Sequence, residues 1–292
     1  MTADRRDTQP VSSDARPVPP SILGNYFSQE GAKGALVAFF STLGFFLLAI
    51  VIIGRSENWP AVQRSFFNWD IIVDSFPKVW EGFRTNVWMF LIGQVAIMAL
   101  ALVIAMMRSL KGPAFFPLRL LAIVYIDFFR GIPIILGLYL FGFGVPALRL
   151  TGVPGSAAFW GLLVVVLSYS AYTAEVYRSG IDAVPDSQRL SAASLGLTQF
   201  QALRYAVLPQ AIRNVIPALL NGFVSLQKDV ALLAVLGVRE AVREAQIASG
   251  RDFNYSPYIA ATLLFLAISV PSARFADWYT ARDRARRSQG VG

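Results

Sequence analysis

Four long stretches without a single charged residue restrict the fold of this chain more than any other feature. Each reaches the roughly 20 residues that an α-helix needs to cross the hydrocarbon core of a bilayer. The four stretches are residues 34–54, 85–107, 150–174 and 253–273. Two further apolar segments, about 120–141 and 215–236, contain two charged residues each. The six segments predict an all-α integral membrane protein with six transmembrane helices.

Composition agrees with a membrane protein and removes several kinds of chemistry. The 292 residues are 55% hydrophobic and 15% charged, which is too apolar for a soluble domain of this size. With no Cys and no His, the chain lacks disulfides, thiol and imidazole catalysis and the commonest metal ligands. It also lacks a G-x-x-x-x-G-K-S/T phosphate-binding loop. We therefore expect no enzyme activity and no metal or cofactor in this chain.

Basic residues lie mainly on one side of the predicted spans. The segments 1–33, 108–119, 175–214 and 274–292 together hold 16 Lys and Arg, against 8 on the opposite side. Cytoplasmic loops are the ones enriched in these residues, so both termini and the long loop 175–214 are predicted to be cytoplasmic. The same rule accounts for the net charge of +8, which in a soluble protein would favour a nucleic-acid partner. No such partner is expected here.

The long cytoplasmic loop carries the most organised sequence of the chain. It reads VPDSQRLSAASLGLTQFQALRYAVLPQAIRNVIP from Val184 to Pro217. An amphipathic helix is predicted around Leu190, with Gly196 allowing the turn that follows, and Leu208-Pro209 predicts a break before the next span. An organised loop of this length favours a docking role. An ordinary amphipathic loop of a membrane protein is the alternative.

Five short elements follow one another in an order and spacing that are typical of one family. They are Phe129–Pro133, Ala171–Arg178, the loop around Gly196, Leu208–Ala211 with Pro217 and Asn221, and Lys228-Asp229. Over about residues 76–279 the chain resembles the permease subunits of bacterial ABC importers for polar amino acids, the histidine, glutamine and arginine uptake group. The resemblance implies a type I ABC importer permease fold in the bacterial inner membrane.

The loop motif of these permeases, E-A-A-x3-G-x9-I-x-L-P, docks into the ATPase subunit. The resemblance assigns this coupling role to Gln188, Leu190, Ser191, Ala192, Gly196, Leu208 and Pro209. Leu190 occupies the position of the acidic residue, where a Glu could contribute about 1.5–3 kcal/mol through a charge-assisted hydrogen bond. Three explanations are open: docking by shape, a Glu supplied by a partner permease, or weak coupling.

Charged and polar residues inside the spans are the candidates for a translocation path, because such groups usually face a cavity or a partner. The candidates are Arg130, Asn221, Lys228 and Asp229. Structural ion pairing, as between Asp127 and Arg130, or hydrogen bonding between helices is the alternative. Glu175 and Arg178 are three residues apart and predict a local salt bridge that orients the start of the loop.

Composition and apolar patterning, together with the resemblance, divide the chain into segments. These are a disordered cytoplasmic tail (1–33), an extra N-terminal transmembrane helix (34–54), an amphipathic segment on the outer face (55–84), a permease core (85–279) with its coupling loop (178–213), and a basic cytoplasmic tail (280–292).

The function implied by the resemblance is that of the permease subunit of an ATP-driven amino-acid importer. Its partners would be a second permease (a second copy or a paralogue), ABC ATPase subunits and a periplasmic amino-acid-binding protein. ATP and Mg²⁺ would bind to the ATPase and not to this chain. Two alternatives are an ATP-independent secondary transporter or channel, and a non-transporting membrane scaffold with a degenerate loop.

Overall fold

A computed structural model describes residues 31–110 and 112–289, and every regular element in this part of the chain is helical. Five helices are long and apolar enough to span a membrane, and a sixth span results when one bent pair of helices is counted as a single span. The prediction of an all-helical protein with several membrane spans is confirmed. Residues 1–30 of the predicted tail lie outside the described residues.

The chain divides into two compact units, Met1–Ala61 and Val62–Gly292. In the first unit, α2 (Gly31–Gly54) is a helix of 24 residues whose described apolar side chains are almost all exposed. A helix that is apolar all round is stable only where lipid or protein covers it, so α2 suits a membrane span. The short helix α3 (Trp59–Phe66) follows.

The second unit is built around α4 (Trp69–Ser109), a helix of 41 residues. The boundary expected at residue 84 does not coincide with a helix end, because residues 69–84 continue α4 without a break. Their charged side chains lie on an exposed face, while Ile72, Val79 and Phe83 are buried on the other. These three pack with alanines of α12 (Ala241–Asp252) and α13 (Ser256–Gln289). The segment is therefore part of the helical core.

A sharp bend interrupts the span predicted over residues 120–141. The helix α5 (Phe116–Gly131) ends before Ile132-Pro133, since a residue that precedes proline disfavours the helical region. After a bend of 102° the chain continues through three short elements. They are α6 (Ile134–Gly137), the π-helical stretch η2 (Leu138–Phe143) and α7 (Gly144–Ala147). The span predicted as a single helix is therefore a bent pair of helices, which still counts as one candidate span.

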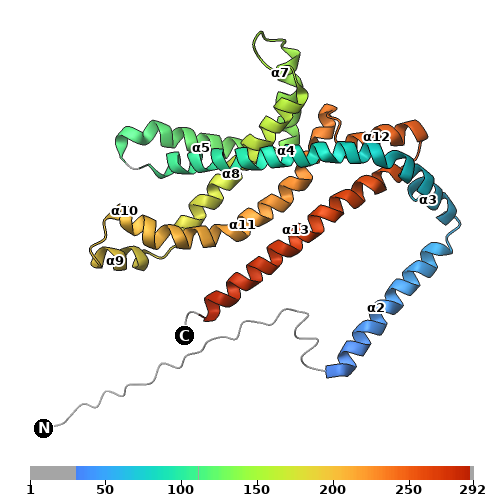
Figure 1. The fold of residues 1–292 in the computed structure, drawn as a ribbon, viewed down its shortest axis with the longest axis horizontal. Helices are drawn as coiled ribbons and strands as arrows, with labels where there is room; N and C mark the ends of the chain where they lie inside the picture. The colour runs from blue at the N-terminus through green and yellow to red at the C-terminus, as the bar shows by residue number, and fades with distance from the viewer. Residues whose placement is uncertain (1–30, 111, 290–292) are drawn as a thin grey trace. The chain divides into compact units, whose positions relative to one another are not determined.

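Two more long helices, α8 (Ala157–Asp182) and α11 (Leu208–Asp229), complete the core. The 3-10 helix η4 (Val230–Leu236) extends α11. Apolar side chains from α4, α8, α11, η2 and η4 form the largest buried cluster. The short helices of the long loop lie at the end of α11 that is remote from α12 (Figure 1).

The packing of α12 on α4 leaves no room for a side chain at Gly82. A Cβ atom there would stand 2.6 Å from the carbonyl carbon of Glu240. Glycine therefore permits the close approach of the two backbones. This contact holds the N-terminal part of α4 against the turn that leads into α12.

Candidate functional site: the long loop and a polar cavity

The long loop begins with α9 (Asp186–Ser194), which starts directly after Pro185. Ala192 is the buried residue of this helix, whereas Leu190 is 68% exposed. Gln188 accepts a hydrogen bond from Gln210 Nε2 at 3.3 Å, which links α9 to α11. The loop is therefore tied to α11, and Leu190 points away from that contact into free space.

Gly196 ends α9 in a left-handed conformation, with φ at +76°. The backbone N–H groups of Gly196 and Leu197 donate to carbonyls of Ala193 and Ala192, which closes the helix end. A capping box between Thr198 and Gln201 then starts α10 (Gln199–Ala202). The turn that the sequence places at Gly196 thus forms where a residue with a side chain would be strained.

The break predicted at Leu208-Pro209 was wrong, because the chain is helical from Gln199 to Leu236. A π-helical turn, η3 (Leu203–Val207), joins α10 directly to α11. Pro209 stands in the first turn of α11, directly after this π-helical turn. The loop and α11 therefore form one continuous helical segment.

The loop also exposes large apolar side chains that sequence reasoning did not single out. Leu195 is 80% exposed, Phe200 68% and Tyr205 65%. Together with Leu190 they give the loop an apolar surface. The signal that was available is their type: large apolar residues in a loop that is also rich in polar ones.

Glu175 is the centre of an ion-pair cluster at the loop end of α8. It pairs with Arg108 of α4 and with Arg178, whose Nη2 lies 3.1 Å from Glu175 Oε2. Arg178 also pairs with Asp182 at 2.5 Å. The Glu175–Arg178 contact predicted from their spacing is present. Arg108 adds a tie between α4 and α8 that the sequence did not indicate.

A cavity of about 400 Å³ lies between α4, α6, α8 and α11. Its polar lining comes from Gln94, Tyr169, Tyr172, Thr173, Ser225 and Asp229. Tyr169 donates a hydrogen bond of 2.6 Å from its hydroxyl to the Asp229 carboxylate. The cavity thus offers an acidic group, hydroxyl groups and aromatic rings, which together suit a small ligand with a cationic amine.

Of the four residues predicted for a translocation path, Asp229 alone lines this cavity. Arg130 lies next to it: its guanidinium is 5.5 Å from the ring centroid of Tyr172. Asn221 and Lys228 are exposed and do not line it. In the described residues the guanidinium of Arg130 makes this ring contact, and the ion pair with Asp127 that was the alternative to a role in the path is not formed.

Comparison with known proteins places the chain among transport proteins. The family model described as "Binding-protein-dependent transport system inner membrane component" matches residues 113–284. The chain is similar to the "Probable amino-acid ABC transporter permease protein YckA" of Bacillus subtilis, with 35% identity over 76% of this chain and 94% of the relative. It is also 31% identical to the "Probable amino-acid permease protein YxeN" of the same organism, over 70% of this chain and 90% of the relative.

A solved structure shares both the fold and part of the sequence. It is described as an amino acid ABC transporter crystallised with histidines, and it is 29% identical with a TM-score of 0.67. The match covers 74% of this chain and 98% of that one.

Proposed function

Because this chain belongs to the family of binding-protein-dependent transport system inner membrane components, we propose that it is the permease subunit of an ATP-driven amino-acid importer in a bacterial inner membrane. The long loop would dock into a separate ATPase, and the cavity beside Asp229 would be part of the translocation path. The excess of basic residues supports a cytoplasmic position for this loop and for both termini.

One observation carries the proposal: a continuous helical segment joins the exposed loop to the polar cavity. It runs from Gln199 to Leu236 and contains Asp229, which lines the cavity. A displacement of α10 by an ATPase partner would therefore be transmitted to the cavity wall along one helical segment, whereas α9 is joined to that segment through the turn at Gly196. This is the connection that an importer needs between ATP-driven closure and alternating access.

Docking on this proposal rests on apolar contact. The position of the family's acidic residue is Leu190, which is 68% exposed and so is available to a partner. Ser191 is exposed beside it, while Ala192 packs inward and holds the helix to the rest of the loop. Of the three explanations for Leu190, the exposed apolar residues of the loop favour docking by shape and burial.

The cavity suits the charged groups of an amino acid. The Asp229 carboxylate would accept hydrogen bonds from an ammonium group, with Tyr169 holding the carboxylate in place. The Arg130 guanidinium, beside Tyr172, would meet a carboxylate at the edge of the cavity. Lys228 and Asn221, which are exposed on α11, would face the path or the second permease that completes it.

The test is ATP hydrolysis by the chain co-purified with its ATPase and reconstituted with the binding protein and single amino acids. We expect one class of amino acid to stimulate hydrolysis. Gly196→Asp should abolish that stimulation, because the left-handed turn at position 196 disfavours a residue with a side chain. As a matched control, Gly152→Asp alters another glycine of positive φ, at +78°, outside the loop. Uptake that needs no ATPase would instead support an ATP-independent transporter.

A further inference from the structure

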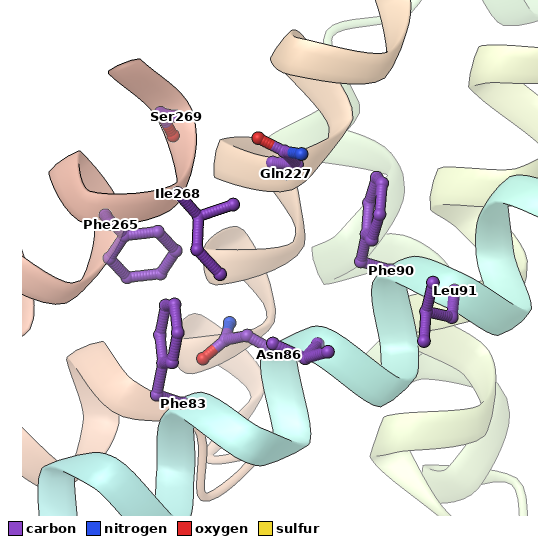
Figure 2. Close-up of a pocket in the computed structure, with 9 residues that line it drawn as sticks. Phe83, Asn86, Phe90, Leu91, Gln227, Phe265, Ile268 and Ser269 are labelled. Carbon is purple, nitrogen blue, oxygen red and sulfur yellow. The ribbon is translucent and has the colours of Figure 1, made fainter. Parts of the chain in front are cut away.

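A second cavity lies between α4, α11 and α13, apart from the one that contains Asp229. Its volume is about 110 Å³ (Figure 2). Six of its nine lining residues are apolar, and the polar three are Asn86, Gln227 and Ser269. No charged side chain lines it, so the ammonium and carboxylate groups of an amino acid would find no counter-charge there.

Two polar atoms at this cavity are buried without a hydrogen-bond partner in the described protein. They are Gln227 Oε1 and Ser269 Oγ. Gln227 is only 9% exposed, and its amide nitrogen donates to Ser272 Oγ at 3.2 Å, so the amide oxygen alone is left over. Figure 2 shows Gln227 and Ser269 on the same side of the cavity, one on α11 and one on α13.

The third polar side chain already has a partner for its amide nitrogen and one for its amide oxygen. Asn86 donates to Glu240 Oε2 at 2.9 Å and accepts from the Ala241 backbone N–H at 3.0 Å. The two atoms at this cavity that still lack a hydrogen-bond partner are therefore Gln227 Oε1 and Ser269 Oγ. Both lie within candidate membrane spans, and in a lipid environment an unsatisfied polar atom is strongly unfavourable.

We propose that this cavity binds water, which bridges Gln227 Oε1 and Ser269 Oγ and so joins α11 to α13. A bound water needs roughly 10–15 Å³ and two to four polar partners. The cavity exceeds that volume, the amide oxygen accepts a hydrogen bond, and the serine hydroxyl donates or accepts one. A lipid chain could occupy the apolar side near Leu91 and Ile268, but hydrocarbon cannot satisfy either polar atom.

The direct test is a high-resolution structure of the full chain in lipid nanodiscs, determined with its ATPase partner. We expect an ordered solvent peak within hydrogen-bonding distance of both Gln227 Oε1 and Ser269 Oγ. The peak should be lost in Ser269→Ala. Acyl-chain density against these two atoms, a direct contact between them, or a dry cavity would each overturn the proposal.

A stability measurement gives an independent test, because wet and dry cavities predict opposite signs. If water bridges the two side chains, Ser269→Ala removes a hydrogen bond and should lower the Tm by about 2–4 °C. If the Ser269 hydroxyl is unsatisfied, the same substitution removes an unfavourable group and raises the Tm. Ser272→Ala is the matched control: it is also a Ser→Ala change on α13, but the hydroxyl that it removes accepts a hydrogen bond directly from Gln227.

A double-mutant cycle then shows whether one water serves both residues. Gln227→Met and Ser269→Ala would be combined in a Ser272→Ala background, so that the direct hydrogen bond to Gln227 is not counted. A shared water predicts that the double variant loses less Tm than the two single variants together. Strict additivity would contradict it. None of these measurements depends on transport. Their outcome therefore does not depend on whether the proposed importer function is correct.

Discussion

At the scale of single residues, the contact between Asn86 and Glu240 controls how α12 joins the core. Glu240 is fully buried at the start of α12. Its Oε1 accepts from the Arg243 backbone N–H at 2.7 Å, and its Oε2 accepts from Asn86. Burial raises the pKa of the Glu240 carboxyl above its usual range, and these hydrogen bonds oppose the shift. Glu244 is a nearby acidic group that raises the pKa further.

This arrangement makes stability depend on pH in a defined direction. With its pKa raised on folding, Glu240 favours the folded state most below its unfolded pKa of about 4.3, and that contribution is lost as the pH rises toward the folded pKa. Asn86→Ala removes a hydrogen-bond donor to the Glu240 carboxylate and should raise the pKa of Glu240 further. We expect a loss of about 1–3 kcal/mol near pH 8, and a smaller loss near pH 5.

The measurement for Asn86→Ala is thermal unfolding in nanodiscs across that pH range. Gln246→Ala provides a control on the exposed face of α12. A loss of stability that is equal at both ends of the pH range would show that Glu240 is not the group involved.

At the scale of elements, sequence patterns predicted which segments are helices better than where those helices end. Charge-free stretches fix the spans because lipid tolerates few alternatives. The start of α4 was missed because its charges lie on an exposed face of a helix that buries the other. The continuity of α10 with α11 was missed because a π-helical turn, which leaves no sequence signature here, accommodates Pro209.

The cavity lining shows the same limit. The charge of Asp229 marked it in the sequence as a candidate for the cavity. The lining residues of α8 are uncharged, so charge did not mark them. A helical spacing was nevertheless present: Tyr169, Tyr172, Thr173 and Val176 follow the i, i+3, i+4, i+7 pattern of one helix face. Polar and aromatic residues on one face of an apolar span would have been enough to place this wall of the cavity.

The loop supports a prediction about docking. Leu190→Glu places a charge on a side chain that is 68% exposed and that we propose the ATPase buries. Losing the burial of one leucine should weaken binding of the ATPase about tenfold to a hundredfold. Leu148→Glu, at a position 64% exposed outside the loop, should leave binding unchanged. Affinity between solubilised permease and ATPase measures the effect, and tighter binding with Glu would mean that the partner offers a basic group instead.

At the scale of the whole molecule, uptake tests whether the cavity is the path. Asp229→Asn keeps the size of the side chain and the acceptor for Tyr169, but removes the negative charge. The KM for amino-acid uptake into proteoliposomes should rise by about tenfold or more, the effect of losing a charge-assisted hydrogen bond. Arg149→Gln, an exposed charge outside the cavity, is the control. An unchanged KM in Asp229→Asn would remove this cavity from the path.

The unbroken helix from the loop to the cavity has a mechanical consequence. From Gln199 to Asp229 it is about 45 Å long when measured along the helix, and a rigid tilt of about 5° around one end would displace the other by about 4 Å. That displacement is larger than the diameter of a water molecule. On the proposed docking of the loop to an ATPase, a small rotation there would therefore widen or seal a chamber of about 400 Å³ without a large refolding step.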